Sequence, residues 1–405
     1  MRGTKLQSVA PVRHQRASAR RANTGDDADR LRAPVSGIGG RTLRSSLARL
    51  EGVVPAPAQP QQDSGPVSGR GQYPSGSGRA DGGTVRLLRG DCPDGGPRFD
   101  RVVPAGGYAW WYVDALSDDA RHGLTLIAFV GSVFSPFYAR ARRLAPLGLA
   151  EPLQFCALNV ALYGEGRRWA FTERGQGAVR RTPTSLVIGP NSLHWDGSSL
   201  RIDIDERTAP FGTHIRVTVR VHPSALPNQT ALLDGEGRHR WTPISPCSWV
   251  EVDLSKPALR WSGAGYLDSN HGDAPLEHAF RNWTWSRART RAGTTVLYDV
   301  AQRSGDMLSL ALAFGSTGDV RAIDAPPESS LQTTRWRISR SIRSDAGYRP
   351  RVVQTLEDTP FYARSLVSSR LHGEPVTAMH ESLSLDRFCA GWVRTLLPFR
   401  MRRER

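Results

Sequence analysis

The sequence predicts an all-β protein, in which two antiparallel β units follow a disordered N-terminal arm. Runs with an apolar residue at every second position recur after residue 98, and turn signals separate them at intervals of roughly 8–12 residues. Nearly all aromatic residues also lie after residue 98. The chain has 405 residues, which is more than one small domain needs and enough for two of moderate size.

The arm is predicted over residues 1–98. Only Tyr73 among the aromatic residues precedes Phe99, and the segment holds 16 basic against 8 acidic residues. So little apolar surface cannot offset the entropy lost on ordering the chain, about 1–2 kcal/mol per residue. Two interpretations stay open: a basic arm that contacts anionic lipid, and an extension that is under no selection or follows from a start codon placed too early.

The strands follow in order from Phe99. Residues 215–222 and 200–205 alternate apolar and polar side chains, which is typical of a strand with one wet face. Glycine-containing turns at residues 164–166 and 196–197 are typical of hairpins. Further strands are predicted at residues 108–113, 124–130, 158–162, 169–171, 193–195, 249–254, 294–300, 308–314, 331–338, 351–356 and 361–367.

Helical periodicity is scarce, and helices are predicted only at residues 274–282 and 386–397. The turn-rich stretch at residues 269–275 predicts the boundary between the two β units. We therefore expect a first domain over residues 99–275, which carries the candidate site described below, and a second over residues 276–405.

Charge and cysteine usage exclude several classes of protein. Basic residues number 54 against 38 acidic, a formal net charge of +16, but Lys5 and Lys256 are the only lysines. This arginine bias is typical of a GC-rich genome, and after residue 98 the basic excess falls to 8 and is spread along the chain, so nucleic acid is not expected as a partner. The four cysteines lie far apart with no CxxC, which argues against a disulfide framework or a zinc site.

Membrane and export signals are also missing from the sequence pattern. No apolar run approaches the ~18 residues of a membrane span, and the start of the chain lacks the apolar stretch of a secretory signal. We expect a soluble protein of a reducing compartment.

Two short stretches carry candidate chemistry. In a strand, His239 and Trp241 share one face, and Tyr266 and Asp268 share another by the same rule. If the two strands are neighbours, one acid, one imidazole and two aromatic rings converge. Each residue also has a plain structural interpretation: Asp268 as a turn carboxylate that caps residues 269–272, His239 as a surface or core histidine, and both aromatic residues as core.

A longer set of motifs runs from about residue 99 to the end of the chain. Its members are GGYAWWYVDALSDD (106–119), LIAFVGSVFSPFYARARR (126–143), ALNVALYG (157–164), HRWTPISP (239–246), GYLDSN (265–270), LEDTPFYARSLV (356–367) and GEPVTAMHESLSLDRF (373–388). Together they resemble a known family, the carotenoid 1,2-hydratases, also called hydroxyneurosporene synthases, of phototrophic bacteria.

This resemblance implies both a fold and a reaction. The fold is two tandem lipocalin-like antiparallel β-barrels. The reaction adds water across the C1=C2 bond of the ψ end group of acyclic carotenoids such as neurosporene and lycopene, with no redox cofactor and no metal. The catalytic residues of the family correspond to Asp268, His239, Trp241 and Tyr266.

The chemistry explains these residue types. A neutral Asp268 protonates C2, and the two aromatic rings stabilise the tertiary cation at C1 by about 2 kcal/mol each when desolvated. His239 orients Asp268, returns its proton or positions the water; alternatively, Tyr266 holds the water and His239 only orients Asp268. A lipocalin-like carrier that binds the polyene unchanged is the alternative function.

Other motifs have simpler interpretations. Residues 270–273 with Glu277 and His278 have no trusted metal-ligand spacing, so turn chemistry is preferred. The acidic residues of the pairs 357–358 and 380–381 have two interpretations, a second carboxylate near the pocket and a structural ion pair with nearby arginines, of which the ion pair is preferred. The apolar and basic residues 392–403 suit either a peripheral membrane contact or an ordinary last element with a charged end. With a carotenoid substrate, we expect peripheral contact with lipid at the cytoplasmic side of the bacterial inner or intracytoplasmic membrane.

Overall fold

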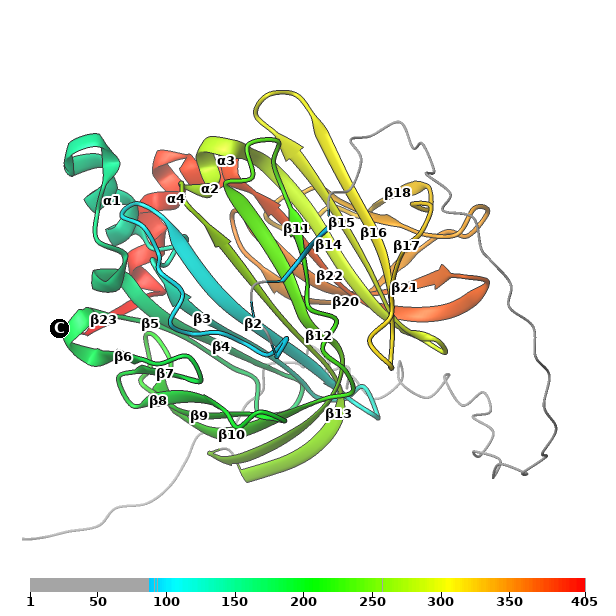
Figure 1. Cartoon of the computed structure of the whole chain (residues 1–405), viewed down its shortest axis with the longest axis horizontal. Helices are drawn as coiled ribbons and strands as arrows, with labels where there is room; N and C mark the ends of the chain where they lie inside the picture. Colours follow the sequence, from blue (N-terminus) through cyan, green and yellow to red (C-terminus); the bar gives the residue numbers. More distant parts are fainter. Residues whose placement is uncertain (1–86, 91, 93, 257, 405) are drawn as a thin grey trace, which may run out of the picture. The chain divides into compact units, whose positions relative to one another are not determined.

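The computed structural model describes residues 87–90, 92, 94–256 and 258–404, and strands account for most of them. The all-β prediction is confirmed, and Figure 1 shows the strands arranged in strongly curved sheets. Residues 1–86 of the predicted arm lie outside the described residues. Within residues 87–98, the short strand β1 (Leu87–Arg89) pairs with β11 (Gln229–Leu232), so the arm is predicted too long by at least this strand.

The first sheet contains fourteen of the described strands. Its path runs β23-β5-β4-β3-β2-β13-β12-β10-β9-β8-β7-β6, and β11 joins β1 to β12. Its strand pairs are antiparallel, except that β23 pairs in parallel with β5. Besides β1 and β11, the bounds are β2 (Tyr108–Ser117), β3 (Gly123–Val130), β4 (Cys156–Tyr163), β5 (Arg168–Arg174), β6 (Val179–Arg181), β7 (Ser185–Ile188), β8 (Asn191–Trp195), β9 (Leu200–Arg207), β10 (His214–Pro223), β12 (His239–Lys256), β13 (Ala258–Gly272) and β23 (Arg402–Glu404).

The second sheet contains seven of the described strands in the order β17-β16-β15-β14-β22-β21-β20, and β18 and β19 form a separate pair. All these pairings are antiparallel. The bounds are β14 (Phe280–Thr290), β15 (Gly293–Gln302), β16 (Met307–Gly315), β17 (Val320–Ala322), β18 (Glu328–Leu331), β19 (Arg340–Arg343), β20 (Arg351–Asp358), β21 (Tyr362–Leu371) and β22 (Glu374–Ser384).

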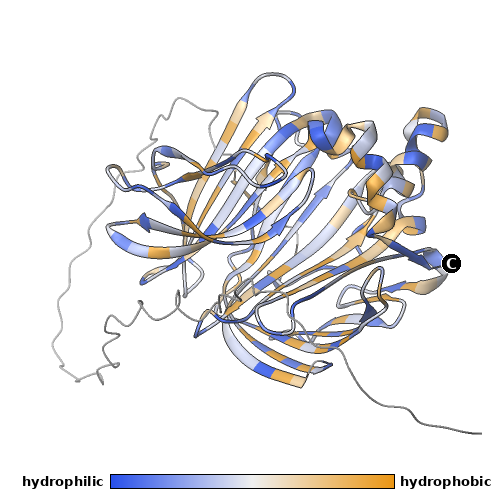
Figure 2. Cartoon of the chain, turned by 180° about the vertical axis from the view of Figure 1, so that it is seen from behind, coloured by the Kyte–Doolittle hydropathy of each residue, from blue (hydrophilic) through white to orange (hydrophobic). Residues whose placement is uncertain are grey.

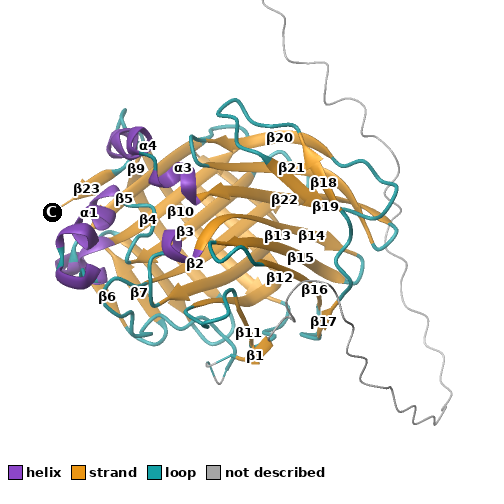
Figure 3. Cartoon of the chain, turned by 90° about the horizontal axis from the view of Figure 1, so that it is seen from above, coloured by secondary structure: helices purple, strands orange, loops and turns teal. Residues whose placement is uncertain are grey.

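Short helices lie beside the strands, and Figure 3 shows α1, α3 and α4 on the same side of them. The helix α1 is not predicted by periodicity, although its start carries a clear signal. Ser135 accepts hydrogen bonds from the amides of Phe137 and Tyr138, and Pro136 occupies the first position of the helix. The bounds are α1 (Pro136–Leu144), η1 (Pro146–Gly148), η2 (Pro152–Phe155), η3 (Gln176–Ala178), α2 (Leu276–Ala279), α3 (Leu385–Cys389), α4 (Gly391–Leu396) and η4 (Leu397–Phe399).

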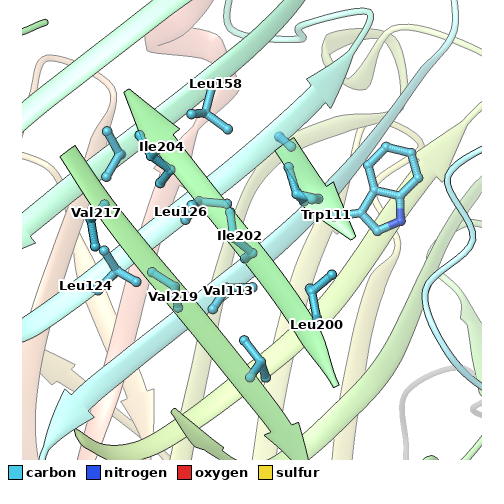
Figure 4. Close-up of a cluster of buried hydrophobic side chains, with 14 of the residues drawn as sticks. Trp111, Val113, Leu124, Leu126, Leu158, Leu200, Ile202, Ile204, Val217 and Val219 are labelled. Carbon is cyan, nitrogen blue, oxygen red and sulfur yellow. The ribbon is translucent and has the colours of Figure 1, made fainter. Parts of the chain in front are cut away.

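The first sheet is buried on both faces along its central strands. One face holds an aliphatic cluster that includes Val113, Leu126 and Ile202 (Figure 4). The other face packs against the second sheet through an aromatic cluster, to which Trp241 and Trp285 belong. Strand β2 is therefore apolar almost throughout, whereas β10 alternates hydrophobic and hydrophilic residues, a banding that recurs along the strands in Figure 2.

The chain passes from the first sheet to the second between β13 and β14. The division into two domains at residue 275 stays a prediction, because the two sheets share the aromatic cluster. Two local predictions are wrong here. The helix predicted at residues 274–282 shrinks to the four residues of α2, and β14 begins at Phe280, since Trp283 and Trp285 alternate inward. Of the strand predicted at residues 331–338, only Leu331 lies in a strand, at the end of β18.

Candidate active site

Asp268 lies within β13, between β12 and β2. It stands opposite Pro243 on β12 and Tyr112 on β2 in the strand register. Tyr266 and Asp268 share the face that points into the aromatic layer between the sheets, as the sequence predicts. Residues 269–272 continue the strand instead of forming a turn, so the turn-capping interpretation of Asp268 is wrong.

The carboxyl group of Asp268 has one fully engaged oxygen and one free oxygen. Oδ2 accepts hydrogen bonds from the Trp241 indole Nε1 and from the Tyr266 hydroxyl, both at 2.8 Å. Oδ1 is buried and meets no hydrogen-bond donor among the described residues. A protonated carboxyl fits this arrangement, because the acidic proton takes Oδ1 while Oδ2 keeps both donors.

Burial raises the pKa of Asp268 to about 8, and the hydrogen bonds from Trp241 and Tyr266 oppose this rise. The negative charges of Glu381 and Asp114 raise the pKa further. Only 4% of the residue is exposed. Asp268 is therefore largely protonated at neutral pH, which is the state that an acid needs at the start of a turnover.

Aromatic rings from both sheets surround this acid. The Tyr266 ring meets Trp285 of β14 edge-on at 5.1 Å and Tyr112 at 6.1 Å. The Trp241 ring meets Tyr298 of β15 edge-on at 5.8 Å. Negative π-faces close to the acid are suited to stabilising a cation that forms beside it.

His239 lies on the same strand as Trp241 but outside hydrogen-bonding reach of Asp268. It pairs with Gly272, four positions from Asp268, which is about 13 Å along β13 at the usual rise of a strand. Its Nδ1 shares a 2.9 Å hydrogen bond with the Tyr108 hydroxyl, and burial lowers its pKa to about 4. The structure thus brings Asp268, Trp241 and Tyr266 together and gives His239 a different partner.

A cavity of about 470 Å³ lies between the two sheets and the C-terminal helices. Tyr112, the residue opposite Asp268, forms part of its wall together with Trp283. Leu396 and Phe399, which are exposed, also line it, so the cavity reaches the surface. Asp268, Trp241 and Tyr266 are not among its lining residues, and Tyr112 stands between them and the cavity. The other aromatic lining residues are Trp110, Phe129, Phe134, Trp169, Phe171, Trp336, Phe361 and Tyr362. Such a wall fits an extended apolar ligand.

A charged network crosses from one sheet to the other beside this cavity. Glu357 and Glu381 both pair with Arg364, at 3.1 and 2.6 Å, which agrees with the ion pairs preferred from the sequence. Asp114 of β2 pairs with Arg287 of β14, and its Oδ2 lies 2.8 Å from the Tyr112 hydroxyl. Sequence reasoning does not single out Asp114, Arg287 or Arg364, because their partners lie more than a hundred residues away in the chain or in another strand.

Residues 270–273, Glu277 and His278, weighed above as a metal cluster, have other roles in the structure. Glu277 pairs with Arg142 of α1 at 2.8 Å, and residues 270–272 belong to β13. The described residues contain no group of three or more potential metal ligands close together. None of the helices in the described part of the chain has the length and apolar character required to cross a bilayer.

Comparison with known proteins identifies the family of the chain. Residues 126–405 match the family model of carotenoid hydratase CrtC. The chain belongs to the carotenoid hydratase family. The acyclic carotenoid 1,2-hydratase of Thiocapsa roseopersicina is 55% identical over 379 residues, and that of Rubrivivax gelatinosus is 52% identical over 381 residues, each alignment covering 93% of both chains.

A more distant carotenoid hydratase matches a smaller share of the chain. The acyclic carotenoid 1,2-hydratase of Cereibacter sphaeroides is 37% identical over 280 residues, which are 69% of this chain and 98% of that protein. A solved structure described as a putative AttH from Nitrosomonas europaea aligns with 68% of this chain at 14% identity, with a TM-score of 0.47. The family model and the hydratases of Thiocapsa roseopersicina and Rubrivivax gelatinosus confirm, at the level of the family, the resemblance inferred from the motifs.

Proposed function

We propose that this protein is a hydro-lyase that adds water across the C1=C2 bond of the ψ end group of acyclic carotenoids. The proposal depends on one observation above all: Asp268 is a buried acid with a raised pKa and a free oxygen, beside an aromatic cavity. A lipid carrier has no use for a carboxyl group in such a place, because burying it costs free energy. The family of the chain supports the same reaction.

In the proposed mechanism, neutral Asp268 donates its proton from Oδ1 to C2. The π electrons form the new C2–H bond and leave a tertiary cation at C1. Trp241 and Tyr266 stabilise this cation through their rings, and their hydrogen bonds to Oδ2 hold the carboxylate in place. Water then forms the C1–O bond and gives up a proton. No electrons are gained or lost overall, so the reaction requires no redox cofactor, and Asp268 supplies the electrophile without a metal.

His239 has a positioning role in this proposal. It binds Tyr108, and the Tyr108 ring stacks on Trp110, a wall residue of the cavity, at a centroid distance of 5.0 Å. Because burial lowers its pKa to about 4, the imidazole is neutral at pH 7 and does not donate the proton of the first step. We expect His239→Ala to weaken substrate binding more than the chemical step.

The surface around the cavity supports a peripheral contact with membrane lipid, as a carotenoid dissolved in a bilayer requires. Trp392, Leu396 and Phe399 are exposed by 48%, 42% and 75%. Arg394 and Arg400 lie among them in the sequence, and Arg400 lines the cavity. Aromatic, apolar and cationic side chains together suit the interface of an anionic bilayer. We propose that this surface meets the cytoplasmic leaflet.

The first experiment is anaerobic incubation of the purified protein with lycopene in lipid, in water enriched in ¹⁸O and without added cofactor. Mass spectrometry then reports whether the product carries one labelled hydroxyl group. We expect a labelled alcohol from the wild type and none from Asp268→Asn, which keeps the shape of the side chain but not its acidity. Lycopene that binds but stays unchanged in the wild type would favour the carrier function instead.

A further inference from the structure

Hydration requires a second proton transfer, from the attacking water to a base. The water that attacks C1 must lose a proton as the C1–O bond forms, and a nearby carboxylate is a suitable base. Asp268 is a carboxylate at this stage, but it is placed at C2, and the hydrogen bonds from Trp241 and Tyr266 to Oδ2 hold it there. The water attacks at C1. The inference that follows depends on the proposed hydratase function and concerns the base at C1.

Glu381 lies on β22 of the second sheet and lines the aromatic cavity. Its Oε1 takes every hydrogen bond that the described residues give to this side chain: two from the Arg364 guanidinium, at 2.6 and 3.1 Å, and one from the Tyr112 hydroxyl at 2.9 Å. No described donor reaches Oε2. The side chain is 13% exposed, so Glu381 presents a carboxylate oxygen without a partner next to the substrate space.

Tyr112 is a neighbour of both Asp268 and Glu381. Tyr112 stands opposite Asp268 in the β2–β13 pairing, and its hydroxyl reaches Glu381 across the layer between the sheets. Glu381 in turn pairs with Trp285 of β14, whose ring contacts both Tyr112 and Tyr266. An end group beside Tyr112 therefore lies near both an acid from the first sheet and a carboxylate from the second sheet.

A second polar atom in the cavity lacks a partner. The Tyr362 hydroxyl is buried without a hydrogen bond among the described residues, and Tyr362 lines the same cavity. Arg364 packs over the Tyr362 ring at 5.5 Å and also binds Glu381. A buried water needs two or more polar partners, and Glu381 Oε2 together with the Tyr362 hydroxyl offers them.

The other carboxylates of the network are less suitable. Asp114 is fully buried, its Oδ1 is engaged by Arg287, and it does not line the cavity. Its Oδ2 competes with Glu381 Oε1 for the single proton of the Tyr112 hydroxyl. Glu357 accepts hydrogen bonds from the Tyr163 hydroxyl and from Arg364, and no hydrogen bond joins it to Tyr112. Among these three carboxylates, only Glu381 combines a free oxygen, a place in the cavity wall and a direct connection to the residue opposite Asp268.

We propose that Glu381 is the general base of the hydration and that, with Tyr362, it binds the attacking water. The water oxygen forms the bond to C1, one O–H bond breaks, and the proton moves to Glu381 Oε2. Asp268 has by then lost one proton to C2 and Glu381 has gained one from water, so the sum is the addition of one water molecule. Exchange of protons with solvent restores both groups before the next turnover.

The test separates the two proton transfers by running the reaction with lycopene in deuterated water. Asp268 then delivers deuterium to C2, and a cation that escapes capture can lose the original C2 proton and return as deuterated lycopene. In Glu381→Gln we expect the alcohol to form about 10²–10⁴-fold more slowly, the range for loss of a general base, while deuterium still enters the recovered lycopene. Tyr362→Phe should shift the ratio of exchange to hydration in the same direction by a smaller factor.

Asp299→Asn is the matched control, because Asp299 also lies in the second sheet, is also 13% exposed and also pairs with an arginine, Arg343. We expect it to hydrate lycopene within about twofold of the wild type, far from the loss expected for a base. Glu381→Asp serves as a second test if Glu381→Gln folds poorly. It keeps the carboxylate but shortens the side chain by one methylene group, so it should hydrate lycopene faster than Glu381→Gln does.

Three results would overturn the assignment: hydration by Glu381→Gln at the wild-type rate, equal loss of exchange and hydration in a folded Glu381→Gln variant, or no recovery in a folded Glu381→Asp variant. Failure of the proposed function gives a different result, since the wild type itself then yields neither the alcohol nor deuterium exchange.

Discussion

The hydrogen bond from Tyr266 to Asp268 predicts a measurable shift in the pH dependence of the reaction. The proposed mechanism needs neutral Asp268, so the rate should fall as pH rises through its pKa of about 8. The Tyr266 hydroxyl stabilises the charged form and thereby lowers this pKa. Burial raises the pKa of Tyr266 well above its usual value, so the hydroxyl stays a donor throughout the range of the assay. Tyr266→Phe should therefore move the alkaline limb upward.

The size of the shift follows from the 2.8 Å hydrogen bond to Oδ2. A hydrogen bond to a charged group contributes about 1.5–3 kcal/mol, and one to a neutral group about 0.5–1.5 kcal/mol. The difference is about 1–1.5 kcal/mol, and 1.36 kcal/mol corresponds to one pKa unit. We expect the alkaline limb of kcat to move up by about one pH unit, with a lower maximal rate because the ring loses its polar anchor.

The assay follows the formation of the alcohol from lycopene in lipid between pH 6 and 10, with thermal unfolding measured at each pH. Tyr348→Phe is the control, since that hydroxyl contacts Ser368 in the second sheet and has no contact with Asp268. An alkaline limb that stays in place or moves down in Tyr266→Phe would mean that Asp268 is not the titrating acid or that Tyr266 does not donate to its charged form.

Three further predictions concern stability, the cation and the membrane. Because the pKa of Asp268 is higher in the folded protein than the usual 3.8, its contribution to stability should decline between about pH 4 and 8; the Tm of Asp268→Asn relative to the wild type should rise over this range and level off above it. Trp241→Phe should retain more activity than Trp241→Ala at equal folded fraction, and equal losses would indicate packing instead of cation stabilisation. Replacing Trp392 and Phe399 by serine should reduce sedimentation with anionic vesicles and slow hydration of vesicle-bound lycopene more than that of lycopene in detergent.

Part of this structure could be predicted from the sequence because period-two alternation is a local property. Residues 215–222 form β10 and residues 200–205 fall within β9, since each strand buries one face only. Strand β14 was missed because its Trp283 and Trp285 contribute to the shared aromatic cluster, and such packing against the other sheet is not visible in a local pattern. Helix α1 was missed for another reason: with nine residues it is too short to show a clear helical period, and its cap at Ser135 is the signal that marks it.

Part of the candidate site can likewise be predicted from the sequence, and part cannot. The spacing of Tyr266 and Asp268 predicts a shared face, and the pairing of β12 with β13 then brings Trp241 within 2.8 Å of the acid. Sequence spacing puts His239 on that face as well, but it cannot give the register, and the register separates His239 from Asp268 by four positions. For Glu381 the sequence favours an ion pair over a second carboxylate near the pocket, because its link to Tyr112 spans 269 residues of chain and cannot be seen locally.

The acidity of Asp268 therefore depends on residues that contribute no group to the first proton transfer. On the first sheet alone, its carboxyl group would face water, and the hydrogen bonds from Trp241 and Tyr266 would lower its pKa. The second sheet covers that face with Trp285 and Tyr298, and burial then becomes the largest influence on the pKa. The same sheet carries Glu381, so the packing of the two sheets both makes Asp268 an acid and sets a base opposite it. Substitutions that loosen this packing should first shift the alkaline limb downward and only later unfold the protein.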